Sequence, residues 1–282
     1  MKKYQLLIVT VTYKPNIEEL SLFVMSLRKY NDLSDNAKLI IVDNSPDDSW
    51  DKEKWINNNL DIDLVSNPSN PGFGASNNLG FKQYDSDYVL FINNDVEFIE
   101  PVFKQLISLH EVNEQLGCIG IRQNGGAPSF FKKFDAPSNI TNLEFIDKYH
   151  FISGAFMFFK SSVFKKCGCF DENIFMFWEE YDMSVRLINK GYFTAYYPQC
   201  SFLHKTGNRK KVNKERWMVA TKSYCYVCVK NGINPKKYFS SKRLYKLLAY
   251  QVINFNCRQV CEIIDTLISR KKILREYTAG LK

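Results

Sequence analysis

Short hydrophobic runs that alternate with helix-forming segments constrain the fold of this chain more than any other feature. Residues 6–12, 38–42, 64–67 and 87–92 are rich in β-branched and aromatic residues and predict strands. Segments with helical spacing or helix-start residues follow them. Such an alternation predicts a mostly parallel sheet with helices on both faces, because each connection crosses one face to return to the same end of the sheet. We therefore expect an α/β fold.

The chain between residues 100 and 200 is less regular. Ser161 is expected to cap a short helix that Gly168 closes. Residues 122–148 have little periodicity and predict a mobile loop near the site. Strands are expected at 118–121, 151–159 and 192–197, the second of them interrupted at Ser153-Gly154, where the backbone would pass a ligand.

Polar residues follow several of the predicted strands directly. In open parallel sheets ligands bind beyond the carboxyl ends of the strands, and Asp43 stands at such an end. Asp95 follows the strand 87–92 after Asn93-Asn94 and suits a hard divalent cation, which in turn binds diphosphate oxygens. The structural alternative is an acid that caps the next turn. Gly72 and Gly74, after Asn70, would let the backbone approach a ligand and open a helix toward an anion, or form a tight turn before that helix.

Three acids cluster at the start of a predicted helix that ends at Gly191. Glu179 and Asp182 are three residues apart and share a face, whereas Glu180 lies about 100° around the axis. One interpretation is a general base among them. The other is an exposed helix start whose acids match the helix dipole, with an Asp182–Arg186 surface pair at i,i+4.

The charge is unevenly distributed along the chain. The net charge is +8, yet residues 1–204 contain 19 Lys and Arg against 26 Asp and Glu, and residues 205–282 contain 19 against 4. Basic residues interleaved with apolar ones predict a helix that lies on anionic lipid, or else a solvated helix face packed on the body; these are Lys236, Lys237, Lys242, Arg243 and Lys246. Nucleic acid is not an expected partner, because the body is acidic and contains no recognition motif.

Neither end of the chain predicts export or a membrane span. The apolar run after Met1 is too short for a signal peptide, and no run reaches the ~18 residues of a spanning helix. We therefore expect a cytoplasmic protein, soluble or peripheral at the inner face of the cell membrane. Its eight cysteines should be free thiols, and the Cys225–Cys228 pair should be buried apolar residues, with metal or redox use as the alternative.

A series of motifs between residues 6 and 206 resembles family 2 inverting glycosyltransferases, in particular the bacterial rhamnosyltransferase-like group. The motifs are VTVTYKP, IVDNSPDD, NPGFGASNNLG, FINNDVEF, FISGAFMFF, GCFDENIFMFWEEYDMSVR and YPQCSFLHK. The resemblance implies a GT-A fold over residues 1–205, Rossmann-like, with a nucleotide-binding half (about 1–100) and an acceptor and catalytic half (101–205). The basic helical region 206–282 lies outside it.

The resemblance also implies roles for individual residues. Thr12 and Asp43 would hold the base and ribose of a nucleotide-sugar. Asp95 would be the last acid of the D-x-D motif and, with His204, would bind Mg²⁺ or Mn²⁺. Glu180 would be the catalytic base, with Glu179 and Asp182 as rivals. Further residues are expected in the nucleotide-sugar site, namely Tyr13, Asn70, Gly72, Gly74, Asn78, Asn94 and Gly154. The sequence departs from the family at Asn93, at the second Glu of the acidic pair and at Lys14.

The activity implied is transfer of rhamnose or a similar sugar, from dTDP-rhamnose or another nucleoside diphosphate sugar, to a glycan hydroxyl. A lipid-linked oligosaccharide acceptor for O-antigen or capsule would suit the basic tail. Two alternatives stay open: a nucleotidyltransferase, which would release pyrophosphate, and a non-catalytic subunit of glycosyltransferase type. The sequence assigns no oligomeric state.

Overall fold

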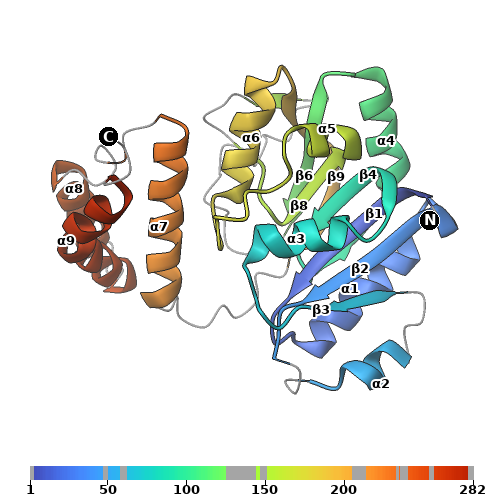
Figure 1. The fold of residues 1–282 in the computed structure, drawn as a ribbon, viewed down its shortest axis with the longest axis horizontal. Coiled ribbons are helices and arrows are strands. Elements are labelled where there is room, and N and C mark those ends of the chain that lie inside the picture. Colours follow the sequence, from blue (N-terminus) through green and yellow to red (C-terminus); the bar gives the residue numbers. More distant parts are fainter. Residues whose placement is uncertain are drawn as a thin grey trace. The chain divides into compact units, whose positions relative to one another are not determined.

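The structure is a computed structural model in which two compact units are distinguished (Figure 1). The first comprises Met1–Asn173 with Glu179–Asn208, and the second comprises Ile174–Trp178 with Arg209–Lys282. The residues described are 3–46, 50–57, 62–124, 144–146, 151–204, 214–232, 235, 241–253 and 257–278.

The first unit is built on one twisted sheet. Its described strands are β1 (Lys3–Thr12), β2 (Ala37–Asp43), β3 (Asp63–Ser66), β4 (Asp85–Ile92), β5 (Val96–Phe98), β6 (Leu116–Asn124), β7 (Glu144–Ile146), β8 (Phe156–Lys160) and β9 (Phe193–His204). Their spatial order is β3-β2-β1-β4-β8-β6-β9-β5, and β7 also pairs with β9. The four strands β3, β2, β1 and β4 are parallel to one another, as predicted. The sheet becomes mixed beyond them, because β8 is antiparallel to both β4 and β6.

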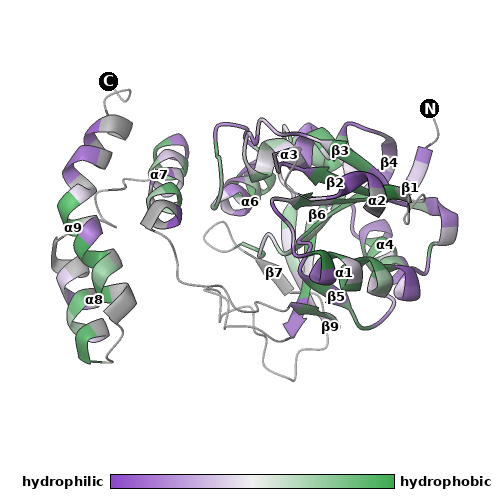
Figure 2. Cartoon of the chain, turned by 90° about the horizontal axis from the view of Figure 1, so that it is seen from below, coloured by the Kyte–Doolittle hydropathy of each residue, from purple (hydrophilic) through white to green (hydrophobic). Residues whose placement is uncertain are grey.

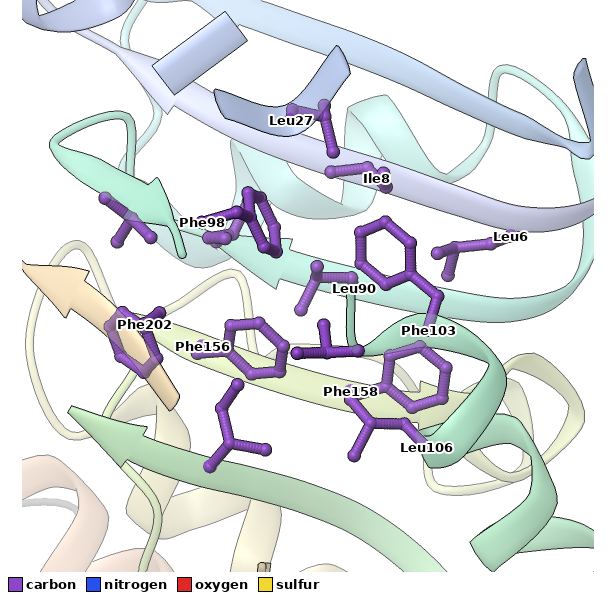
Figure 3. Close-up of a cluster of buried hydrophobic side chains, with 14 of the residues drawn as sticks. Leu6, Ile8, Leu27, Leu90, Phe98, Phe103, Leu106, Phe156, Phe158 and Phe202 are labelled. Carbon is purple, nitrogen blue, oxygen red and sulfur yellow. The ribbon is translucent and has the colours of Figure 1, made fainter. Parts of the chain in front are cut away.

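Helices cover both faces of this sheet, which the alternation of strands and helices predicted. One face packs on α1 (Ile17–Tyr30), α2 (Lys52–Asn57) and α4 (Phe103–Val112). The other packs on α3 (Phe73–Phe81), α5 (Ser161–Lys166) and α6 (Glu179–Asn189). Successive residues of β1 point to opposite faces, so Leu6 and Ile8 join the first cluster while Leu7 and Val9 join the second. Figure 3 shows part of the first cluster, with Phe98, Phe103, Phe156, Phe158 and Phe202 beside the aliphatic side chains of β1 and β4.

Several element predictions for residues 100–200 were wrong in their bounds. The strand predicted at 151–159 is confined to β8, and the one predicted at 192–197 continues as β9 to His204. β9 passes Pro198 through a register shift against β6, and such an irregularity accommodates a residue that cannot donate to the ladder. Of the predicted loop 122–148, residues 122–124 belong to β6 and 144–146 form β7, while the remainder lies outside the described residues.

The helix α5 begins differently from the prediction. Ser161 does not cap it, because the Ser161 hydroxyl lies 3.0 Å from the Ser86 hydroxyl in the core. Gly168 does close this turn of chain, with a φ of +86°.

The second unit is helical in its described part, with α7 (Lys214–Lys230), α8 (Ser241–Ile253) and α9 (Cys257–Thr278). Cys225 and Cys228 are buried on α7, and burial raises the pKa of both thiols, that of Cys225 to about 12, as suits buried apolar residues. Segment Ile174–Trp178 belongs to this unit, where the Trp178 ring packs edge-on against Tyr224. Among the helices of the described residues, none has the length and apolarity needed to cross a membrane.

Candidate active site

The carboxyl ends of β1 and β2 meet at Thr12 and Asp43, which are register partners. The Asp43 carboxylate is fully buried and accepts bonds from Thr12 Oγ1 (2.7 Å), Ser45 Oγ (2.6 Å) and Trp50 Nε1 (3.1 Å). Lys52 Nζ lies 2.9 Å from it. Burial alone would raise the pKa of Asp43, but the bonds from Ser45, Lys52, Thr12 and Trp50 outweigh it and hold this pKa below its ordinary value. Both carboxylate oxygens are thus engaged by the protein, and Asp43 organises the loop that follows β2.

A network of amide side chains joins that loop to the start of α3. Asn44 Nδ2 donates to Asn70 Oδ1 (3.1 Å), while Asn44 Oδ1 accepts from Asn67 Nδ2 (2.8 Å) and Ser76 Oγ (2.9 Å). Asn70 and Gly72 both have positive φ, and the value of 109° at Gly72 favours glycine at the residue before α3. The sequence interpretation named Asn70 and Gly72 but missed Asn44, Asn67 and Ser76. The concentration of asparagines after strands was the available indication.

Two of the predicted site residues in α3, Gly74 and Asn78, pack this helix against a distant loop. The Asn78 side chain is 2% exposed and pairs with the backbone of Phe170, donating to its carbonyl (2.9 Å) and accepting from its N–H (3.0 Å). A Cβ on Gly74 would lie 3.0 Å from Phe170 Cβ. The absence of a side chain at Gly74 therefore allows Phe170 to pack closely against α3. Both residues therefore fix α3 against the loop that leads toward the acidic helix.

The three acids do occupy the first turn of α6, as predicted, but their environments differ. Asp182 is fully buried and bonded to Arg186 Nε at 2.8 Å, and Arg186 also donates to the Cys167 carbonyl. The predicted pair therefore exists, but its prediction as a surface pair was wrong. Glu179 is 5% exposed and its Oε2 has no hydrogen-bond partner. Burial, and secondarily the charge of Glu180, raise the pKa of Glu179 well above its ordinary value. Glu180 alone of the three is partly exposed.

Gly154 brings the Asp95 turn and the acidic helix together. A Cβ at Gly154 would lie 3.7 Å from Glu180 Oε1 and 3.9 Å from Phe73 at the start of α3. The Asn93 N–H donates to the carbonyl of the adjacent Ala155 (3.2 Å). The segment around Gly154 therefore lies between the turn that holds Asp95 and the Glu180 carboxylate. The sequence had indicated a strand interruption here but not its neighbours.

The two residues expected to bind a cation are in contact, although 109 residues separate them. His204 Nε2 lies 3.0 Å from Asp95 Oδ1, because β5 pairs with β9 and sets Val96 opposite His204. His204 is 4% exposed and its Nδ1 has no hydrogen-bond partner, while the Asp95 side chain is 23% exposed. In the described part of the chain, no three His, Cys, Asp or Glu residues gather into a metal site. The pair fits a cation that takes its other ligands from diphosphate and water.

The remaining predicted residues lie at the edge of this region. Tyr13 is 55% exposed, and the Lys14 ammonium lies 5.7 Å from the centre of its ring. The Lys14 N–H donates to Ser45 Oγ (2.6 Å), so the residue that departs from the family is tied to the Asp43 loop. Asn94 is half-buried in the turn between β4 and β5.

Comparison with known proteins shows the fold and the family to which this chain belongs. The fold is a GT-A fold, as expected from the sequence. The Glycosyl transferase family 2 profile matches residues 7–168, and the chain belongs to that family.

Three similar proteins illustrate the relationship. The chain is 26% identical over 195 residues to the low-salt glycan biosynthesis hexosyltransferase Agl10 of Haloferax volcanii, covering 60% of this chain and 62% of that protein. It is 24% identical over 204 residues to the rhamnosyltransferase WbbL of Escherichia coli K12, covering 63% and 76%. The mannosyltransferase PcManGT of Pyrobaculum calidifontis, solved with GDP-Man and Mn²⁺, superposes with a TM-score of 0.59 at 13% identity, covering 82% of this chain and 64% of that one. The chain thus spans less than two thirds of Agl10.

Proposed function

We propose that this protein transfers a hexose or 6-deoxyhexose such as rhamnose from a nucleoside diphosphate sugar to a hydroxyl of a glycan acceptor, inverting the anomeric carbon. Membership in glycosyltransferase family 2 supports glycosyl transfer over nucleotidyl transfer. The observation that carries the assignment is the position of Glu180. It is the one partly exposed acid in the first turn of α6, and it lies beside Gly154 and the start of α3.

Glu180 is the proposed general base. A sugar hydroxyl is a poor nucleophile, so a carboxylate must accept its proton as the oxygen attacks. The bond from the acceptor oxygen to the anomeric carbon forms while the bond from that carbon to the diphosphate oxygen breaks, and the proton passes to Glu180. Glu179 is the weaker candidate because its carboxyl is buried away from an incoming acceptor hydroxyl, and this burial raises its pKa well above the ordinary value. Asp182 supports the helix through its pairing with Arg186.

The donor would occupy the carboxyl ends of β1, β2 and β4. Its diphosphate would meet the free N–H groups at the start of α3, after Gly72 and Asn70, while Thr12, Tyr13, Asp43 and Asn94 border the nucleotide-sugar. Asp95 and His204 would hold Mg²⁺ or Mn²⁺. Such a cation neutralises charge on the departing diphosphate. The Mn²⁺ and GDP-Man in PcManGT support both the cation and a donor of this class.

The acceptor is proposed to be a lipid-linked oligosaccharide used in cell-surface polysaccharide synthesis, such as O-antigen or capsule. The names of Agl10 and WbbL support glycan synthesis and a hexosyl or rhamnosyl donor. In this proposal residues 1–100 bind the nucleotide, residues 101–205 supply the acceptor side, and the enzyme works in the cytoplasm at the inner face of the membrane.

A panel of nucleoside diphosphate sugars tests the proposal. Purified protein is incubated with each donor, including dTDP-rhamnose, UDP-sugars and GDP-sugars, with Mg²⁺ or Mn²⁺ and with candidate acceptors. Release of nucleoside diphosphate together with a glycosylated product is the expected result. Release of pyrophosphate from a nucleoside triphosphate would establish the nucleotidyltransferase alternative. Nucleotide-sugar binding without transfer or donor hydrolysis would identify a non-catalytic subunit.

A further inference from the structure

The helix α8 exposes an apolar face within the second unit. Tyr245 is 58% exposed, Tyr250 61%, Val252 54% and Ile253 74%. At about 100° per residue these side chains lie, with the exposed Lys246, within an arc of about 160°. A helix face that meets only water is normally polar, and exposed apolar side chains grouped on one face mark an interaction surface.

The helix α9 exposes a face of the same kind, followed by cations. Ile264 is 42% exposed and Ile268 76%, and Lys271, Lys272 and Arg275 are exposed within the same arc of about 100°. The exposed apolar residues lie toward the start of α9 and the exposed basic ones toward its end. Figure 2 shows the ribbon of α8 and α9 coloured by hydropathy. The opposite side of α9 packs inside the unit, where Ile263 is 8% exposed.

The exposed apolar residues of the two helices are close along the chain. Val252 and Ile253 end α8, and only residues 254–256 separate it from α9, which packs against α8. This surface overlaps in part with the one predicted from sequence. Lys246 belongs to both, whereas Lys236 and Lys237 lie outside the described residues and Leu248 is partly buried. The exposed apolar side chains come from α8 and also from α9.

We propose that the exposed faces of α8 and α9 bind the surface of an anionic membrane. Tyrosine rings and aliphatic side chains enter the boundary between headgroups and acyl chains, while lysine and arginine meet the anionic headgroups. Residues 205–282 carry 19 Lys and Arg against 4 Asp and Glu, and no acidic residue is exposed in the described parts of the two faces. An anionic surface complements these cations better than a second copy of the chain, which would bring like charges to the same face.

Vesicle sedimentation with the full chain tests this surface. The protein is expected to sediment with phosphatidylcholine vesicles that contain phosphatidylglycerol, to bind pure phosphatidylcholine much less, and to be released by salt. The assay needs neither donor nor acceptor, so its outcome is independent of the proposed transferase activity.

Two variants and a matched control identify the residues. Lys271→Glu/Lys272→Glu/Arg275→Glu should lower binding about 100-fold, because each basic residue near the surface contributes about 1 kcal/mol. Ile268→Ser should lower binding several-fold and, because Ile268 is 76% exposed, should fold like the parent by circular dichroism. Arg28→Glu/Lys29→Glu/Lys104→Glu makes the same change of charge at exposed positions of α1 and α4 and should bind like the parent.

Three outcomes would overturn the proposal. The parent protein could fail to bind anionic vesicles. The control variant could lose as much vesicle binding as the α9 variant. Binding would then depend on the net charge of the protein and not on the α9 surface. Ile268→Ser could leave vesicle binding intact while converting a dimer to a monomer by light scattering, which would make the face a contact between copies.

Discussion

The side-chain amide of Asn78 exchanges two hydrogen bonds with the backbone of Phe170, across 92 residues of sequence. Asn78 lies in α3, which opens toward the proposed diphosphate site, and Phe170 lies in the loop that precedes the acidic helix. The same amide also donates to Glu172 Oε1 at 3.1 Å. Asn78 therefore links α3, at the proposed donor site, to the loop that leads to Glu180.

Replacing Asn78 should weaken both stability and turnover. Asn78→Ala leaves the buried N–H and C=O of Phe170 without partners, at a cost of about 3 kcal/mol, which lowers the melting temperature by about 6–12 °C. Turnover should fall more than donor affinity, because Glu180 is displaced while the nucleotide groups stay in place. Gln83→Ala is the control, because its amide bonds only the local carbonyl of Leu79. Equal losses in both variants would show that the Asn78 link has no particular role.

Conservative amide substitutions separate the roles of the adjacent acids. Glu180→Gln removes the proposed base and should lower kcat by about 10²–10⁴-fold with donor affinity nearly unchanged. Glu179→Gln keeps the shape of a carboxyl that is only 5% exposed and should lower kcat less than tenfold. Steady-state kinetics with donor and acceptor varied separately provides the comparison. If Glu179→Gln were the more damaged enzyme, the base would be Glu179.

The raised pKa of Glu179 predicts a pH dependence of stability. Unfolded, the group titrates near 4.5, whereas its folded pKa lies well above that value. Between the two pKa values, unfolding releases the proton of Glu179. The contribution of this group to the free energy of unfolding is therefore fully present below pH 4.5 and is lost as the pH rises toward the folded pKa. Glu179→Gln has no such proton. As the pH rises from about 4 to 8, the free energy of unfolding of Glu179→Gln should therefore increase relative to that of the parent protein. A difference that stays constant with pH, by urea unfolding, would contradict a protonated Glu179.

Local pattern predicted the part of the fold in which strands alternate with helices along the chain. The four parallel strands alternate with helices, as predicted, and the Asn16 side chain caps the start of α1. The direction of β8 and the short strands β5 and β7 were not predicted, because three-residue strands lack a period and pairing depends on distant segments. Ser161 was expected as a cap, but a hydroxyl 75 residues away gave it a different partner.

For the candidate site, too, the sequence predicted local placements but not the surroundings of each side chain. Spacing predicted three acids in the first turn of α6 and the Asp182–Arg186 pair, and the resemblance put His204 together with Asp95; the structure shows these placements. Burial could not be found in this way, since adjacent Glu179 and Glu180 have the same side chain and differ only in what surrounds them. Gly74 was expected to approach a ligand, and only the fold shows that its neighbour is Phe170.

Removal of either member of the Asp95–His204 pair should weaken cation binding. Asp95→Asn and His204→Ala each delete a proposed ligand, so stabilisation of the protein by Mn²⁺ with nucleoside diphosphate should shrink as the affinity for the cation falls. The readout is the thermal shift with and without Mn²⁺, which does not depend on turnover. Glu97→Gln, two residues after Asp95, is the control for loss of one negative charge. Parent-like Mn²⁺ shifts in both ligand variants would exclude these residues from the metal site.

The engaged carboxylate of Asp43 predicts a large effect on stability from a small chemical change. Asp43→Asn removes the charge that Lys52 faces in the interior, where the Lys52 side chain is 14% exposed, and should cost about 3 kcal/mol. Asp87→Asn breaks the Asp87–Lys3 pair, whose side chains are 49% and 61% exposed, and should leave the urea midpoint unchanged. The pKa of folded Asp43 is lowered, so its contribution is present above 3.8 and is lost as the pH falls through the folded value. The difference in the free energy of unfolding between Asp43→Asn and the parent protein should accordingly become smaller at acidic pH. A gap that persists below the folded pKa would attribute the cost to altered hydrogen-bond geometry instead of charge.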